Sequence, residues 1–184
     1  NTVVTKEMLE EIKPDALIVA IGSSPFVLSI EGSERAIVAH DVLSEKVEVP
    51  GENVVIIGGG LVGFETAEFL AARQKKVTVL EMKEKALQDL GPLRQITAQF
   101  VMAQMPITIE TSATVERIDD HAVVASGKEY PYDSVIMAVG SKANDTSMYA
   151  DLDIPTYIVG DCKKAGVALD AFKDAYHAVL EINK

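Results

Sequence analysis

Hydrophobic and polar positions form a strand–helix–strand pattern between residues 53 and 81. The β-branched run Val54 to Ile57 predicts a strand buried on both faces. Apolar residues then recur at helical spacing from Leu61 to Arg73, and Val77 to Leu80 predicts a second buried strand. Elements in this order predict a βαβ unit with two parallel strands.

The pattern continues with a second helix and a third strand. Pro92 suits the first turn of a helix over residues 93–105. Three apolar residues of this helix are spaced for one face: Ile96, Phe100 and Val101. The charged residues 83–90 before it predict a loop. Pro106 ends the helix, and we expect a third parallel strand over residues 107–109.

Three short strand signals come next, and tight turns at Asp119-Asp120 and Ser126-Gly127 separate them. The three strands are predicted over residues 113–118, 122–125 and 129–132. They predict a β-meander. The fold class is therefore expected to be α/β with three layers: a Rossmann-like parallel sheet with the meander on one face, over residues 52–141.

Two segments have the same form, namely Asp15 to Gly22 and Asp133 to Gly140. Each begins with an aspartate, continues as a buried apolar run and ends in Ala-x-Gly. This internal similarity indicates one structural transition used twice. Ser23-Ser24-Pro25 predicts a break after the first segment, and residues 26–50 indicate a surface connector without clear periodicity.

The two ends of the chain carry simpler signals. Thr2 to Val4 predicts a short strand, and Thr5 is placed as the N-cap of a helix that ends before Pro14. The C-terminal part predicts, in order, a polar loop, a last strand and an amphipathic helix: residues 141–153, 156–159 and 167–182.

Composition and charge exclude several classes of function. The 184 residues are 48% hydrophobic and 24% charged, which is enough to form a core. The formal net charge of −11 disfavours nucleic acid and anionic membranes as partners. No apolar run approaches the roughly 18 residues of a membrane span. Cys162 is the only cysteine, so an internal disulfide is impossible, which fits a cytoplasmic protein.

Catalytic and metal-binding groups are not indicated by the sequence. The three histidines, His40, His121 and His177, lack metal-ligand spacing. A lone cysteine cannot form a redox-active pair, and its expected role is a small buried side chain. We find no nucleophile or proton-relay pattern, so no catalytic residue and no metal site is predicted.

The turn after the first strand reads Gly58-Gly59-Gly60-Leu61-Val62-Gly63, a G-x-G-x-x-G fingerprint. Gly58 permits a tight turn, Gly60 lets a pyrophosphate approach the backbone, and Gly63 allows close packing of helix and strand. The free N–H groups of a helix N-terminus attract phosphate. These positions predict a dinucleotide site, although a glycine turn that binds nothing has the same sequence signature.

Glu81 ends the second strand, about 20 residues after the glycines, as this fingerprint expects. A carboxylate at that position accepts hydrogen bonds from the hydroxyls of the adenosine ribose. Like charges repel, so Glu81 predicts NADH rather than NADPH as the ligand.

Three motifs together resemble the two-dinucleotide-binding-domain flavoproteins. They are the segment Gly58 to Glu65, the two Asp…Ala-x-Gly segments, and Gly160-Asp161-Cys162 followed by a helix. Within that group the chain is most similar to the C-terminal region of 2-enoate and 2,4-dienoyl-CoA reductases, which are related to old yellow enzyme. The resemblance implies an NAD(H)-binding domain over residues 52–141, and partial FAD-domain flanks over residues 1–51 and 142–184.

The resemblance also implies roles for individual residues. Glu65 would lie near the nicotinamide, the alternative being a carboxylate favoured by the first helical turn. Gly140 would border the bound dinucleotide. Asp161 would hydrogen-bond the sugar-like chain of the flavin, the alternative being a turn residue that ends a strand, and Gly160 is assigned to the same cofactor site. Ile21 departs from the pattern, because relatives often carry threonine there.

The implied function is an NADH-binding module of a flavin-dependent oxidoreductase that reduces an unsaturated acid or an enoyl or dienoyl thioester. The chain has one glycine fingerprint rather than two, so we interpret it as a fragment that binds FAD weakly or not at all and is inactive alone. Its partners would be NADH and the rest of the flavoprotein, including an FAD half-domain and a flavin barrel. Two alternatives remain: a non-catalytic nucleotide-responsive or assembly module, or part of another NADH-dependent flavoprotein reductase.

Overall fold

The computed structural model describes residues 1–88 and 90–183. Residue 89 of the expected loop and residue 184 of the expected C-terminal flank lie outside the described residues. The chain divides into two compact units, one formed by Asn1–Ser24 with Ser141–Lys184 and the other by Pro25–Gly140. The Pro25–Gly140 unit contains residues 25–51 as well as residues 52–140. Each unit is described by itself below.

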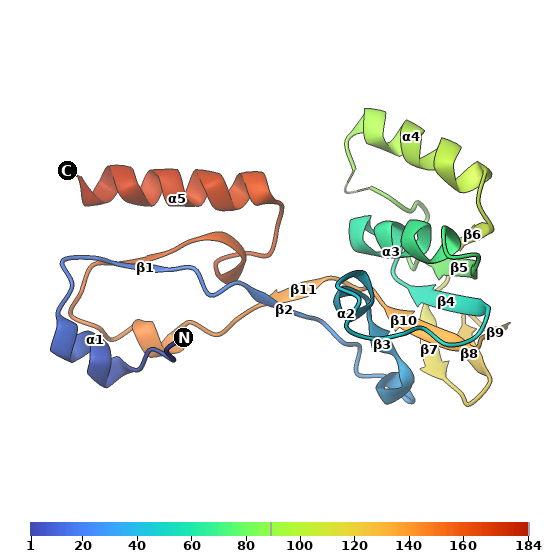
Figure 1. Cartoon of the computed structure of the whole chain (residues 1–184), viewed down its shortest axis with the longest axis horizontal. Helices are drawn as coiled ribbons and strands as arrows, with labels where there is room; N and C mark the ends of the chain where they lie inside the picture. The colour runs from blue at the N-terminus through green and yellow to red at the C-terminus, as the bar shows by residue number, and fades with distance from the viewer. Residues whose placement is uncertain (89, 184) are drawn as a thin grey trace. The chain divides into compact units, whose positions relative to one another are not determined.

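A five-stranded parallel sheet forms the centre of the Pro25–Gly140 unit (Figure 1). Its strands, in spatial order, are β3 (Ile37–Val38), β10 (Ser134–Met137), β4 (Asn53–Ile57), β5 (Lys76–Leu80) and β6 (Ile107–Glu110). In the register of the sheet, Val54 lies beside Val77 on one side and beside Ser134 on the other. The predicted parallel strands are confirmed, and β3 and β10 extend the sheet on the other side of β4.

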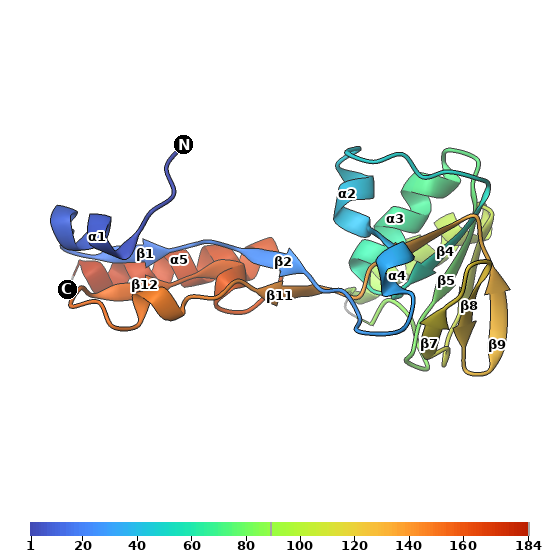
Figure 2. The same ribbon diagram turned by 90° about the horizontal axis from the view of Figure 1, so that it is seen from below.

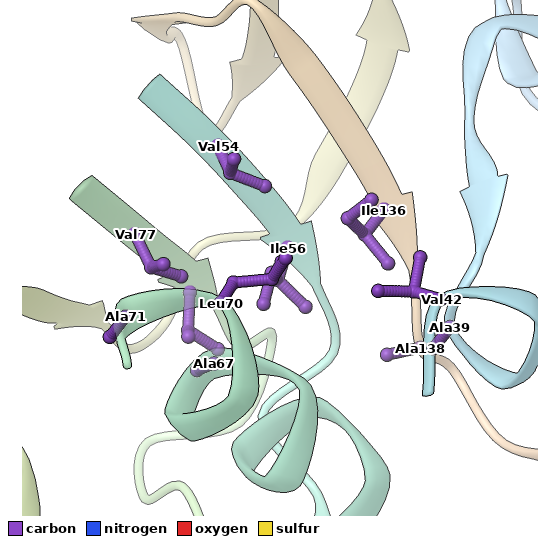
Figure 3. Close-up of a cluster of buried hydrophobic side chains, with 11 residues drawn as sticks. Ala39, Val42, Val54, Ile56, Ala67, Leu70, Ala71, Val77, Ile136 and Ala138 are labelled. Atoms are coloured by element: carbon purple, nitrogen blue, oxygen red, sulfur yellow. The ribbon is translucent and has the colours of Figure 1, made fainter. Parts of the chain in front are cut away.

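Alternating side chains on these strands place one layer on each face of the sheet. Val54 and Ile56 point to the face covered by α3 (Leu61–Ala71), and Figure 3 shows Leu70 of that helix beside Ile56. Val55 and Ile57 point to the opposite cluster, which includes residues of the meander. The Rossmann-like α/β fold with three layers is therefore confirmed.

The predicted meander is an antiparallel sheet whose three strands lie side by side (Figure 2). They are β7 (Val115–Ile118), β8 (Ala122–Ala125) and β9 (Lys128–Pro131). Val123 and Ala125 are fully buried in the cluster that also contains Val55. The meander thus covers the face of the parallel sheet opposite to α3.

The segment between residues 26 and 50 is more than the surface connector that we expected. It contains a 3-10 helix (Ser33–Arg35), strand β3 and helix α2 (Ala39–Leu43). Ala39 and Val42 are almost completely buried beside Ile136 (Figure 3). Elements of two to five residues are too short to create a periodic signal, which explains why the sequence did not reveal them.

Helix α4 (Pro92–Ala103) forms as predicted but buries another face. Ile96 and Phe100 are 52% and 66% exposed, whereas Ala98 is fully buried. Ala98 packs in a third cluster with Phe64, Leu87 and Leu90. The segment before α4 is a loop, as predicted, but two of its leucines belong to the core.

The other unit contains α1 (Lys6–Ile12), β1 (Leu17–Val19), β12 (Thr156–Ile158), two 3-10 helices (Ser147–Tyr149 and Gly160–Cys162) and α5 (Ala168–Ile182). The Thr5 side chain accepts a hydrogen bond from the Met8 N–H at 3.4 Å, so the predicted N-cap is confirmed. Strands β1 and β12 pair in parallel. The strand expected over Thr2 to Val4 is wrong, because residues 1–5 lie outside the helices and strands that the structure describes.

Two further short strands, β2 (Ser23–Pro25) and β11 (Ser141–Ala143), pair with each other. The break and the loop that we expected at these positions are therefore partly wrong. Gly22 and Gly140 precede the two strands, with φ angles of 72° and 100°. Both Ala-x-Gly segments end in the same transition from a strand through a left-handed glycine into the paired ribbon, as their similarity predicted.

Across the described residues, no helix is both long enough and apolar enough to cross a membrane.

Asp133 joins the start of β10 to the start of β4. Its Oδ2 accepts hydrogen bonds from the Asn53 N–H at 2.8 Å and the Glu52 N–H at 2.9 Å. These two bonds, that of Asn53 first, lower the pKa of the Asp133 carboxyl. The charged form is therefore favoured by folding.

This lowered pKa predicts a pH-dependent contribution to stability. The contribution of Asp133 is complete above the unfolded aspartate pKa of about 3.9 and is lost as the pH falls through the lower folded pKa. We expect Asp133→Asn to melt below the wild type at pH 7, with a difference that shrinks below about pH 4. Thermal melts across pH measure this, with exposed Asp151→Asn as the control. A difference independent of pH would contradict the expectation.

Candidate dinucleotide-binding site

Three of the predicted site residues follow the carboxyl ends of neighbouring parallel strands. Gly58 follows β4, Glu81 follows β5, and Gly140 lies three residues after β10. Strand β4 is the point where the chain order reverses, because β5 and β6 lie on one side of it and β10 on the other. Ligands of open α/β sheets bind in the crevice at such a switch point.

The glycine turn requires glycine at two of its positions for steric reasons. Gly58 has a φ of 109°, and a Cβ there would lie 2.4 Å from the Ala138 carbonyl oxygen. A Cβ on Gly63 would lie only 1.9 Å from the carbonyl oxygen of Gly58. The predicted roles of Gly58 in the tight turn and of Gly63 in close helix packing therefore agree with the geometry.

The N-terminus of α3 is open to an anion. Gly60 is its N-cap, and among the described residues no side chain caps this end. The first turn, from Leu61, also lacks an acidic residue. Free N–H groups and the helix dipole suit a phosphate at this position. The residues present therefore fit the pyrophosphate of a dinucleotide.

Glu81 is buried, with 8% exposure, and both of its carboxylate oxygens are hydrogen-bonded. Oε2 accepts from the Gly59 N–H at 2.7 Å, and Oε1 accepts from the Lys83 N–H at 2.8 Å. Each carboxylate oxygen can accept more than one bond, so capacity for ribose hydroxyls is left. Sequence reasoning missed this second role of Glu81, which is to fix the position of Gly59 in the turn.

Glu65 and Gly140 lie in more open surroundings. Glu65 is exposed and belongs to the second turn of α3, because the first turn contains no acid. Its alternative explanation as a first-turn carboxylate is therefore wrong. No described atom outside its chain neighbours lies within 4 Å of a Cβ built on Gly140. Gly140 thus leaves free space beside it.

The other unit contains a cleft of about 610 Å³. Its lining includes Gly22, Gly160, Asp161 and Phe172. Asp161 accepts a hydrogen bond from the Ser23 hydroxyl at 3.1 Å, which fixes its carboxylate at the cleft. The two predicted residues Gly160 and Asp161 therefore lie together at this cleft. In the sequence they are far from the glycine turn.

Asp174 holds the Gly160–Asp161 turn in place. Asp174 on α5 accepts from the Gly160 N–H at 3.2 Å and from Lys163 Nζ at 2.6 Å. The bond from Lys163 lowers the pKa of the Asp174 carboxyl. Cys162 is buried with 5% exposure, so the prediction of a small buried side chain is confirmed.

Residues 1–167 match the family model of the pyridine nucleotide-disulphide oxidoreductases. The chain belongs to this family. It is 34% identical to cinnamate reductase of Clostridium sporogenes over 99% of its own length, and 32% identical to NADH oxidase of Thermoanaerobacter brockii over 96%. Among solved structures, a 2-naphthoyl-CoA reductase complex matches with a TM-score of 0.85 and 31% identity over 97% of this chain.

Members of this family are NAD(P)H-dependent flavoprotein oxidoreductases with NAD(H) and FAD as cofactors. The chain spans 29% of the length of each of the two enzymes and 28% of the solved structure. The disulphide chemistry in the family name is not available within this chain, because Cys162 is its only cysteine.

Proposed function

We propose that the chain is the NADH-binding module of a flavin-dependent reductase that acts on an unsaturated acid or an enoyl or dienoyl thioester, as in the 2-enoate reductases. The observation that carries the proposal is the uncapped N-terminus of α3 beside the buried carboxylate of Glu81 at the switch point of the sheet. The names cinnamate reductase and 2-naphthoyl-CoA reductase support this class of substrate.

In this proposal each residue of the site binds or orients, and the cofactors supply the hydride chemistry. The backbone from Gly58 to Gly63 holds the pyrophosphate, and Glu81 accepts from the ribose hydroxyls. Gly140 borders the dinucleotide, and Glu65 lies toward the nicotinamide. Residues 52–141 form the NAD(H)-binding domain in this assignment.

The direct test is a titration of the ¹⁵N-labelled chain with NADH, followed by NMR. We expect the backbone amide signals of Gly59, Gly60 and Val62 to shift, because N–H groups at a helix N-terminus respond to a bound phosphate. The signal of Gly140 should shift with them, because Gly140 borders the dinucleotide in this proposal. The signals of α1, in the other unit, serve as the internal control. Signal shifts confined to residues outside the glycine turn, or no shifts at millimolar NADH, would contradict the proposed function.

The unit formed by Asn1–Ser24 with Ser141–Lys184 has a proposed role in binding FAD. Gly160 and Asp161 line its cleft, and Asp161 would hydrogen-bond the sugar-like chain of the flavin. Residues 1–51 and 142–184 would be partial FAD-domain flanks, completed by the rest of the flavoprotein. This arrangement makes the FAD half-domain and the flavin barrel the partners of the chain.

We expect the purified chain to lack tightly bound FAD. Only one glycine fingerprint is present in its sequence, and the proposal assigns that one to NADH. The absorbance spectrum of the preparation measures flavin content directly, and added FAD removed by desalting controls for weak binding. A yellow protein that keeps stoichiometric flavin after desalting would show the expectation to be wrong.

A second candidate is a module of another NADH-dependent flavoprotein reductase. The similarity to NADH oxidase of Thermoanaerobacter brockii, at 32% identity, favours it. Both candidates share the same NADH site. They differ in the acceptor of the electrons, which is an unsaturated acid or thioester in the first and another oxidant in the second.

A further inference from the structure

The segment that follows Glu81 packs directly on the glycine turn. The Leu87 N–H donates a hydrogen bond to the Gly59 carbonyl oxygen at 2.9 Å. A Cβ on Gly59 would lie 3.3 Å from the Cβ of Ala86. The position of Gly59 is therefore fixed from two sides. Its N–H donates to Glu81, and its carbonyl oxygen accepts from Leu87.

Leu87 has an unusual backbone conformation for a branched residue. Its φ angle is 61°, in the left-handed region that side chains other than glycine rarely adopt. Its side chain is nevertheless buried, with 5% exposure, in the cluster that includes Phe64 and Ala98. Such a conformation persists only where the surroundings hold it in place.

Gln95 on α4 supplies the bonds that hold this conformation. Its Nε2 donates to the Leu87 carbonyl oxygen at 3.1 Å and to the Leu90 carbonyl oxygen at 2.9 Å. Both partners can only accept, so the amide must direct its NH₂ group toward them. Gln95 is half-buried, and its two bonds join α4 to the segment that contacts Gly59.

We propose that Gln95 is a positioning residue for the adenosine half of the dinucleotide. By fixing Leu87, it holds the Gly59 carbonyl and so keeps the Gly59 N–H on the carboxylate of Glu81, which faces the ribose in the proposed function. In this role Gln95 acts without contacting the ligand. The inference rests on the proposed function and adds a residue that determines affinity from outside the site.

Two variants of Gln95 separate the effect of the bonds from that of the side-chain volume. Gln95→Glu places a carboxylate against two carbonyl oxygens and converts attraction into repulsion. Gln95→Leu removes the two donors and leaves an apolar side chain of similar size. The matched controls are Gln99→Glu and Gln99→Leu, because Gln99 lies one turn later on α4 and is exposed.

The experiment measures the Kd of three ligands and the hydrogen exchange of the Leu87 amide. For Gln95→Glu we expect NADH and AMP to bind about tenfold more weakly, with unchanged binding of nicotinamide mononucleotide and faster exchange of the Leu87 amide. Gln95→Leu should show the same pattern with a smaller change. The Gln99 variants should match the wild type in every measurement.

The following outcomes would overturn the inference. Unchanged NADH and AMP affinities with faster Leu87 exchange would show that the segment is not coupled to the site. An equal loss for all three ligands, in step with a lower Tm, would assign Gln95 a merely structural role. Failure of the wild type to bind NADH would overturn the proposed function as well, whereas wild-type binding with an unchanged Gln95→Glu affinity overturns this inference alone.

Discussion

Replacing Gly63 with alanine is expected to lower the Tm of the Pro25–Gly140 unit by roughly 5 °C or more. The added Cβ would lie 1.9 Å from the Gly58 carbonyl oxygen, which is backbone and cannot rotate away. Overpacking of this kind costs about 1–3 kcal/mol and sometimes more. Each kcal/mol corresponds to a shift of about 4–8 °C for a domain of about 60–100 residues, and to a smaller shift for a larger domain.

Gly91→Ala is the matched control for this substitution. Among the described atoms, none beyond the chain neighbours of Gly91 lies within 4 Å of a Cβ built there. Its φ angle of −62° also suits alanine. We expect a cost of about 1 kcal/mol or less, from the weaker N-cap of α4. Equal melting of Gly63→Ala and the wild type would mean that β4 and α3 are spaced more widely than described.

NADH is expected to bind at least about tenfold more tightly than NADPH, which requires only about 1.4 kcal/mol. Glu81 is buried and held by the N–H groups of Gly59 and Lys83, so its carboxylate cannot turn away from a 2′-phosphate. Two like charges at about 4 Å repel by roughly 1–4 kcal/mol, depending on the local dielectric. The nearest following cations are Lys83 and Lys85, which lack the bidentate fork of arginine.

Calorimetric titration of both nucleotides against the wild type and Glu81→Ala measures this preference. The variant should lose the discrimination and part of its NADH affinity, because the Gly59 N–H is left without its partner. Glu84→Ala, an exposed acid in the same segment, should keep the wild-type preference. Equal affinities in the wild type, or a preference that survives Glu81→Ala, would remove Glu81 as its cause.

The sequence predicts those parts of the fold that depend on local patterns. Val54 to Ile57 and the glycines after them have a period and a spacing that specify strand, turn and helix, and the structure contains all three. Ala39 and Val42 belong to a helix of only five residues, so their burial has no detectable period. The buried face of α4 could not be predicted, because small Ala98 rather than bulky Phe100 contacts its neighbours.

The candidate site follows the same rule. The positions of Gly58, Glu81 and Gly140 could be predicted, because parallel strands bring their carboxyl ends to one edge. The contact from Gln95 to Leu87 joins a side chain to a backbone carbonyl eight residues away. A single bond of this kind leaves no trace in hydrophobic periodicity or composition. Only the structure shows that Leu87 in turn bonds to Gly59 and so links Gln95 to the glycine turn.

The short ladder between β1 and β12 has a consequence for how the unfolding of this chain should be measured. It joins only three residues on each strand, whereas β4 in the other unit has neighbours on both sides. Units with such different strand pairing open locally at different free energies. The backbone amide hydrogens of Leu17–Val19 should therefore exchange with solvent long before those of β4. A two-state fit to a single spectroscopic signal would then merge two transitions and return a midpoint that belongs to neither unit.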